Sequence, residues 1–200
     1  MNAQEILQTK DFKKCLEFHG HICPGLSMGY RASKAGMEWL KEKRSKDEEI
    51  VAIVETDACS ADAVQVITGC TFGKGNFIYK DHGKMVLTLL SRDTGQGVRI
   101  SVKDGVFQVN EEHRSLMQKV MKGNADKAEQ SRFHELHFQR SCHVLEVPVE
   151  KLFNIKPVNI TLPEKAKIEP SKPCEKCGEL TMGSKLENIN GKQICRGCLE

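Results

Sequence analysis

Residues 49–69, EIVAIVETDACSADAVQVITG, join two kinds of secondary structure across a cysteine. The first part is apolar and β-branched, which predicts a strand over residues 49–56. The second part predicts a helix over residues 60–69, with Ser60 as its N-cap residue. Cys59 therefore lies in the turn where a strand ends and a helix starts.

The rest of the chain alternates less regularly. Helices are predicted over residues 5–18, 24–43, 111–121 and 126–141. Strands are predicted over 77–79, 84–91 and 98–102, as a meander, and over 142–149 (CHVLEVPV). Helices that flank a mainly antiparallel sheet, without regular βαβ alternation, predict an α+β fold class.

The C-terminal segment carries two cysteine pairs, Cys174-Glu-Lys-Cys177 and Cys195-Arg-Gly-Cys198, separated by seventeen residues. Two such turns can close a tetrahedral shell around one Zn²⁺. Asn190-Gly191 between the pairs predicts a hairpin turn. Two disulfides or four free thiols are the alternatives to a structural zinc ribbon or treble-clef module.

Chain length and composition predict a large domain and a small module. We expect an α+β metal-binding domain over residues 1–162, a Pro-, Lys- and Glu-rich linker over 163–173, and a zinc-finger domain over 174–200. A segment this short does not build a sufficient core, so zinc is expected to supply its folding energy.

Several features predict a reducing, cytoplasmic setting. The first residues are polar and lack the apolar region of a signal peptide, and the nine cysteines are an odd number. No apolar run reaches the ~20 residues needed to cross a bilayer, so no membrane association is expected. The net charge of +3 is spread evenly, without the basic face that nucleic-acid binding usually needs.

A second group of metal-ligand residues lies near the N-terminus, in Phe18-His-Gly-His-Ile-Cys-Pro-Gly25. If this segment is extended, His19, His21 and Cys23 point to the same side. Pro24 is favoured at the first position of a helix, so Cys23 is expected at or near the N-cap, where the helix dipole lowers a thiol pKa. With Cys59 before another helix, these groups are suited to a divalent transition metal.

Plainer interpretations exist for each of these residues. A single histidine or cysteine is more often packed or solvent-exposed than a ligand. His134 and His137 lie three residues apart on a predicted helix, one residue short of a His-Glu-x-x-His site, which favours a polar helix face. The glycine-rich segment 69–76 lacks phosphate-loop spacing, which favours a structural loop lining a cleft.

Three motifs together resemble the family of the E subunit of formylmethanofuran dehydrogenase. They are Phe18-His-Gly-His-Ile-Cys-Pro-Gly25, Asp57-Ala-Cys-Ser-Ala-Asp-Ala-Val-Gln65 and Gly69-Cys-Thr-Phe-Gly-Lys-Gly-Asn76. The resemblance covers roughly residues 10–150, and the four-cysteine segment resembles a zinc-finger appendage of some members.

The resemblance implies an α+β core, often dimeric, with a His/Cys metal site in a cleft. Its implied ligands are His19, His21, Cys23 and Cys59, and its implied cleft-lining residues are Asp62, Gln65, Cys70 and Lys74. The expected metals are a structural zinc in the C-terminal module and a second transition metal, most simply zinc, at the N-terminal site.

Three functions are consistent with these features. The first is a metal-binding protein that is accessory to a molybdopterin-type oxidoreductase, with that enzyme as a partner. The second is a zinc-finger module for protein or nucleic-acid interaction, carried on a dimerisation domain. The third is a redox protein that uses Cys23 and Cys59 as a thiol pair. None of them specifies a substrate or decides whether the chain is an enzyme.

A homodimer is the expected assembly. Gly29, Ser33 and Gly36 form a stripe of small residues on the helix predicted over 24–43. Such a stripe allows a close approach of another backbone, either within the domain or from a second chain.

Overall fold

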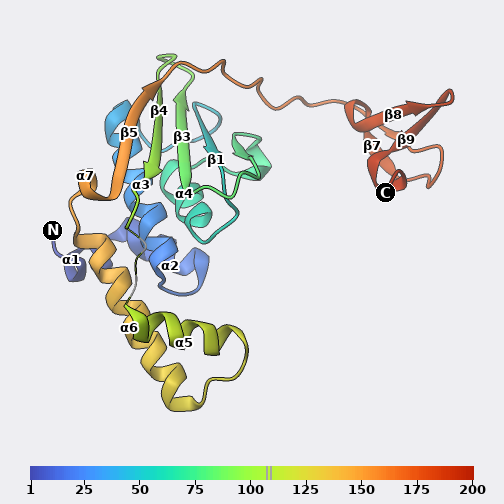
Figure 1. Ribbon diagram of the computed structural model, residues 1–200. Helices are drawn as coiled ribbons and strands as arrows, with labels where there is room; N and C mark the ends of the chain where they lie inside the picture. Colours follow the sequence, from blue (N-terminus) through green and yellow to red (C-terminus); the bar gives the residue numbers. More distant parts are fainter. Residues whose placement is uncertain (107, 109) are drawn as a thin grey trace. The chain divides into compact units, whose positions relative to one another are not determined.

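The computed structural model describes residues 1–106, 108 and 110–200 (Figure 1). It contains two compact units, Met1–Lys165 and Ala166–Glu200. The first unit combines helices with a five-stranded sheet, and this confirms the α+β prediction.

Three helices precede the sheet: α1 (Ala3–Gln8), α2 (Lys10–His19) and α3 (Pro24–Leu40). The sequence predicts a single helix over 5–18, but the chain breaks at Thr9, which is extended. The Thr9 hydroxyl accepts a hydrogen bond from the Phe12 N–H and starts α2 as an N-cap.

The sheet contains β1 (Ile50–Val54), β2 (Phe77–Tyr79), β3 (Val86–Ser91), β4 (Gly97–Val102) and β5 (Phe153–Val158), in the order β2-β1-β3-β4-β5. The β1–β2 pair is parallel and the other pairs are antiparallel. The predicted meander is therefore wrong for β2, because α4 (Ser60–Thr68) crosses over between β1 and β2.

Both faces of the sheet are buried near its centre, where all five residues of β1 are inaccessible. One face packs against α3 and α4 (Figure 1), with Gly36 of α3 beside Leu89 and Ile100. The opposite face carries Val51, Ile53 and Leu90, packed against Ile78, Val158 and Leu162. A fully buried strand explains why residues 50–54 are continuously apolar rather than alternating.

The helices α5 (Glu111–Met121), α6 (Lys127–Glu146) and α7 (Val149–Leu152) follow β4. The strand predicted over 142–149 is wrong, because α6 continues to Glu146 and Pro148 then precedes α7. A short apolar run suits a buried helix as well as a strand. Val144 and Leu145 are buried here, and Arg31 donates a hydrogen bond to the Val147 carbonyl.

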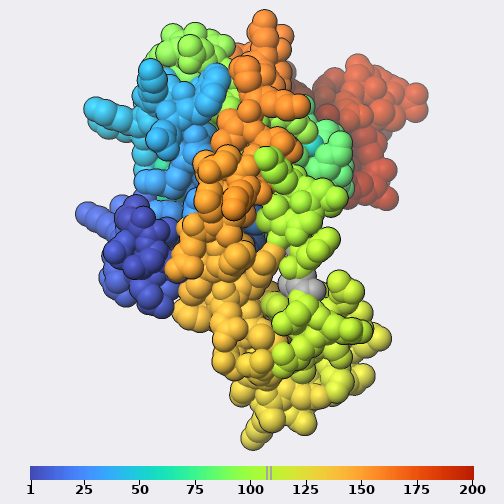
Figure 2. All heavy atoms as spheres, turned by 60° about the vertical axis from the view of Figure 1, so that its left-hand side comes forward, coloured from blue at the N-terminus to red at the C-terminus, as the bar shows by residue number. Residues whose placement is uncertain are grey.

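Helix α6 is anchored to the body of the first unit at one end only. Near its C-terminus, the Glu146 carboxylate accepts a hydrogen bond from the Ala3 N–H, and Figure 2 shows the N-terminal helices beside this part of α6. The other end of α6 and the paired α5 extend away from the sheet (Figure 1). Within α5, His113 is buried.

The second unit consists of two short hairpins: β6 (Ser171–Pro173) with β7 (Leu180–Met182), and β8 (Leu186–Ile189) with β9 (Lys192–Cys195). Asn190 and Gly191 connect β8 to β9 with positive φ angles, as a type I′ turn requires. In the described part of the chain, no helix has both the length and the apolar character needed to cross a membrane.

Candidate metal centres

The N-terminal cluster forms where one helix ends and two others begin. His19 is the last residue of α2, and Gly20 ends that helix in a left-handed conformation with φ 89°. Cys23 is the N-cap of α3, and its Sγ accepts a hydrogen bond from the Leu26 N–H at 3.3 Å. Cys59, rather than Ser60, is the N-cap of α4. The cluster therefore follows from chain reversals and not from an extended segment.

A close approach of α3 and α4 sets the distance between these helix starts. A Cβ atom on Gly29 would lie 2.3 Å from the Ser60 carbonyl oxygen, and one on Gly25 would lie 3.1 Å from Cys59 Cβ. Ser33 is fully buried. The stripe of small residues on α3 is therefore an internal packing surface, and one of its contacts positions Cys59 beside Cys23.

Four side chains meet at this point. One ligand atom each from His19, His21, Cys23 and Cys59 lies within 4.8 Å of the others. The Nε2 atom of His19 is 3.8 Å from Cys23 Sγ. A nitrogen and a sulfur bound to one tetrahedral zinc at the usual bond lengths would be about 3.6 Å apart. The spacing therefore fits a shared metal ion.

Asp62 of α4 orients one of these groups. Its Oδ2 lies 2.7 Å from His19 Nδ1. Because a carboxylate only accepts hydrogen bonds, Nδ1 carries the proton and Nε2 presents its lone pair toward Cys23. A carboxylate behind a histidine is the usual support for a metal-binding imidazole.

The predicted lowering of the Cys23 pKa is wrong for the protein alone. Burial raises the pKa of the Cys23 thiol to about 11, and the N–H of Leu26 only partly offsets this effect. The neighbouring Cys59 thiol raises it further. A bound cation would supply the missing compensation, because it stabilises both thiolates.

The other implied cleft residues lie away from the four ligand groups. Gln65 lines a separate surface pocket with Phe18 and Arg44. Cys70 is fully buried, and its thiol donates a hydrogen bond to the Ile50 carbonyl. Lys74 reaches the Lys46 carbonyl. Of the four implied lining residues, Asp62 is the one that contacts a ligand candidate.

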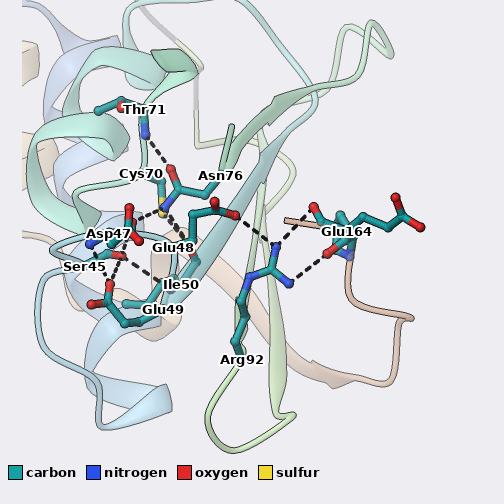
Figure 3. A network of polar contacts seen from close by, with 11 residues as sticks. Ser45, Asp47, Glu48, Glu49, Ile50, Cys70, Thr71, Asn76, Arg92 and Glu164 are labelled. Atoms are coloured by element: carbon teal, nitrogen blue, oxygen red, sulfur yellow. Dashed lines mark hydrogen bonds and ion pairs between the residues drawn. The ribbon is translucent and has the colours of Figure 1, made fainter. Parts of the chain in front are cut away.

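The glycine-rich segment 69–76 has a structural role that Figure 3 displays. The buried Asn76 amide donates hydrogen bonds to the Asp47 and Ile50 carbonyls and accepts one from the Thr71 N–H. These bonds tie the loop to the entry of β1. The favoured interpretation as a tight structural loop agrees with this geometry, although its cleft-lining part does not extend to Cys70.

The C-terminal unit brings its four cysteines together. The sulfur of Cys174 is 4.0 Å from that of Cys198, and the sulfur of Cys177 is 3.9 Å from that of Cys195. Two sulfurs on one tetrahedral zinc would be about 3.8 Å apart, whereas a disulfide needs about 2.05 Å. All nine cysteines, each in the described part of the chain, are free thiols. The four can hold one metal ion.

The thiols in this unit differ in acidity. Backbone N–H groups of Cys177, Cys195 and Lys176 lower the pKa of Cys174 to about 6. Contact with the Cys195 thiol raises the pKa of Cys198 to about 12. The backbone thus favours the first thiolate, and a cation is needed to stabilise four together.

A family model described as "FmdE, Molybdenum formylmethanofuran dehydrogenase operon" matches residues 18–154, which is more than half of the chain. The chain belongs to the FmdE family. This confirms the resemblance drawn from the three motifs.

Two known proteins are similar to this FmdE-family chain. A "Probable S-adenosyl-L-methionine-binding protein" of Archaeoglobus fulgidus is 37% identical over 187 residues, which cover 90% of this chain and 51% of that protein. This chain thus spans about half the length of that relative. The crystal structure of an FmdE-like protein of tungsten formylmethanofuran dehydrogenase, from Syntrophus aciditrophicus, matches with a TM-score of 0.61. It is 24% identical, the match covers 98% of this chain and 91% of that one, and the likeness shows a shared fold.

One surface of this FmdE-family site is not predicted by the sequence. A pocket beside the cluster is lined by His21 and Ile22 from the turn before α3 and by Phe133, His134, His137 and Phe138 from α6. The sequence favours a polar helix face for His134 and His137. A signal for the pocket is nevertheless present, because aromatic and imidazole rings at positions 133, 134, 137 and 138 fall on one side of a helix.

Proposed function

We propose that this chain is a metal-binding FmdE-family protein with two metal ions. The first, a transition metal with zinc as the expected ion, is bound by His19, His21, Cys23 and Cys59. The second is a structural zinc in the four-cysteine unit. The observation that carries the first site is His19, whose ring connects the Asp62 carboxylate on one side with the Cys23 sulfur on the other. A buried thiol with a raised pKa gains most from a cation in this position.

The metal at the first site supplies Lewis-acid chemistry to a ligand that reaches it. His21 is the exposed member of the cluster and faces the pocket on α6, so a ligand has access from that side. Asp62 holds the His19 imidazole in its metal-binding tautomer, and burial of Cys23 limits solvent access from the opposite side.

We further propose that the protein acts beside a molybdopterin-type oxidoreductase in a reducing, cytoplasmic setting. The family description, which refers to the molybdenum formylmethanofuran dehydrogenase operon, supports this proposal. The Archaeoglobus relative adds S-adenosyl-L-methionine as a ligand to test, because that relative's name says that it binds this molecule.

A thiol redox pair is the second candidate function. It is favoured by the sulfurs of Cys23 and Cys59, which belong to one cluster. It is disfavoured by the raised pKa of Cys23, because the thiolate is the reactive form in disulfide exchange. The metal content of the protein separates the two candidates.

The test is elemental analysis of full-length protein purified without oxygen. Two equivalents of metal per chain are expected, and His21→Ala with Cys59→Ala should leave one. The matched control is Cys142→Ala with His143→Ala, which changes the same residue types outside the cluster and should keep two. Unchanged metal content in the first double variant would contradict the N-terminal site. A single equivalent in the unmodified protein would favour the zinc-finger interaction module.

A partner enzyme is tested separately by affinity capture from the native cell. Recovery of a molybdopterin-containing oxidoreductase with the full-length protein is the expected result. Its loss in a variant of the N-terminal site would connect the metal to the association.

A further inference from the structure

The pocket beside His21 has about 560 Å³ of space, which is within the usual range for small-molecule sites. Its walls come from two parts of the chain that are more than a hundred residues apart. The turn before α3 contributes a metal-ligand candidate and Ile22, and α6 contributes two phenyl rings and two imidazoles. A ligand in this pocket would therefore touch the exposed side of the metal cluster.

The pocket walls are mostly apolar and carry no charged side chain. Phe133 and Phe138 offer ring surfaces, and Phe138 is 39% exposed. Ile22 provides a third apolar wall. Apolar rings next to a cation suit a ligand that has an anionic group at one end and a flat apolar body at the other.

One imidazole in the pocket is held in a defined orientation. The Nδ1 atom of His137 lies 3.2 Å from Nε2 of His113, and the His137 ring packs on Phe133 with centroids 4.8 Å apart. His113 is only 5% exposed, and its backbone N–H is bound by the Asn110 side chain at the start of α5. The other ring nitrogen of His137, Nε2, is then positioned for a polar atom of a ligand.

We propose that this pocket binds a small carboxylic acid with an aromatic body. The carboxylate coordinates the metal next to His21, since zinc accepts a carboxylate oxygen and can expand to five ligands. The aromatic body packs against Phe133, Phe138 and Ile22, and His137 forms a hydrogen bond with the ligand. This proposal rests on metal binding at the N-terminal site and extends it to a class of ligand.

The test compares two probes that share one metal-binding head. Benzohydroxamate carries a phenyl group where acetohydroxamate carries a methyl group, and the hydroxamate replaces the carboxylate as a stronger metal ligand. Titration calorimetry on the metal-loaded full-length protein should show benzohydroxamate binding about tenfold more tightly, as expected for burial of a phenyl ring. The four-cysteine unit has no open coordination position and should not respond.

Surface variants identify the pocket. Phe138→Ala and Phe133→Ala should each reduce the advantage of benzohydroxamate while acetohydroxamate binding and metal content stay unchanged. Phe72→Ala is the matched control, because Phe72 is 65% exposed and does not line this pocket. The phenyl advantage should persist in that variant.

Each contrary result has one meaning. If the N-terminal site holds no metal, the proposed function fails and the pocket proposal fails with it. If the metal is present but the two probes bind equally well, or neither binds, the pocket proposal is overturned while the metal site stands. An advantage that survives both Phe133→Ala and Phe138→Ala also overturns it.

Discussion

His19 combines two interactions that a lone histidine rarely has. Its Nδ1 is bound to Asp62, and its Nε2 faces the Cys23 sulfur. The motif that contains His19 is forty-three residues away from Asp62. At the scale of single residues, the metal site therefore depends on a carboxylate that supports a ligand without being one.

We predict that Asp62→Asn weakens metal binding at the N-terminal site by about 10- to 100-fold, as loss of a supporting carboxylate typically does. Competition with a chromophoric chelator measures the affinity. Asp57→Asn is the control, because Asp57 is exposed and lies in the same loop. Equal affinities of the two variants would rule out a supporting role for Asp62.

Glu55 is a second residue with an unusual environment. It is 4% exposed and pairs with Arg99 through both carboxylate oxygens, and His82 Nδ1 lies 3.2 Å from Oε2. Hydrogen bonds from Arg99 lower the pKa of Glu55 from 4.5 to about 2, against the opposing effect of burial. A lowered pKa means that this stabilisation is present above about pH 4.5 and is lost as the pH falls toward 2.

We predict that Glu55→Gln lowers the free energy of unfolding by about 1–2 kcal/mol at pH 7, since it removes charge-assisted hydrogen bonds whose Arg99 partner is partly exposed. The difference from the unmodified protein should shrink between pH 4.5 and 2. Urea unfolding followed by the fluorescence of Trp39, the single tryptophan, reports on the first unit. Glu38→Gln, on an exposed helix face, should change stability by less than about 0.5 kcal/mol.

At the scale of elements, the N-termini of α3 and α4 determine the site. Their approach depends on Gly29, where an added Cβ would meet the Ser60 backbone at 2.3 Å from its carbonyl oxygen. Gly36 is also tight, but it faces flexible side-chain atoms of Leu89 and Ile100. Backbone cannot yield as those side chains can, so the two glycines should differ in their tolerance of a methyl group.

We predict that Gly29→Ala lowers the free energy of unfolding by about 2 kcal/mol or more, because the two helices must separate. Since the same contact positions Cys59, metal affinity at the N-terminal site should also fall. Gly36→Ala should cost less, and Gly73→Ala, with nothing within 4 Å of an added Cβ, should be nearly neutral. Chemical unfolding with chelator competition tests this order, which a neutral Gly29→Ala would refute.

At the scale of the whole molecule, the two units have different sources of stability. The first unit has a continuous core beneath its sheet. Within residues 166–200, all of which the structure describes, Cys174 and Ile194 are the buried apolar side chains. A unit with so small a core needs the metal to fold.

We predict that Cys177→Ser unfolds residues 166–200 and leaves the first unit folded. Amide NMR spectra should lose the dispersed signals of the C-terminal unit, while the unfolding of the first unit seen by Trp39 stays the same. Glu175→Ser, an exposed change within the same pair, is the control. A folded C-terminal unit in metal-free protein would disprove its dependence on zinc.

A homodimer is a further prediction at this scale. The stripe on α3 no longer supports it, because Gly29 and Gly36 are used inside the domain. The resemblance to a family that is often dimeric still does. Light scattering at micromolar concentration should give a mass of about 45 kDa, twice the 22.4 kDa of one chain. A mass near that of one chain would exclude the dimer.

The sequence by itself determined the local features of this protein. The buried strand β1, the helix starts at Cys23 and Cys59, the paired cysteines and the Asn190-Gly191 turn all followed from short-range patterns. These features depend on backbone preferences, helix capping and ligand spacing, which act over a few residues. The three motifs were also sufficient to indicate the family.

The tertiary structure alone decided which distant groups meet. The parallel pairing of β2, the helical state of residues 142–146, the Asp62–His19 bond and the contribution of α6 to the pocket all depend on contacts between remote segments. Apolar runs fit helices and strands alike, and packing against the rest of the core selects between them. Burial likewise outweighed the helix dipole at Cys23, because solvent exclusion is set by the whole fold and not by the residues beside the thiol.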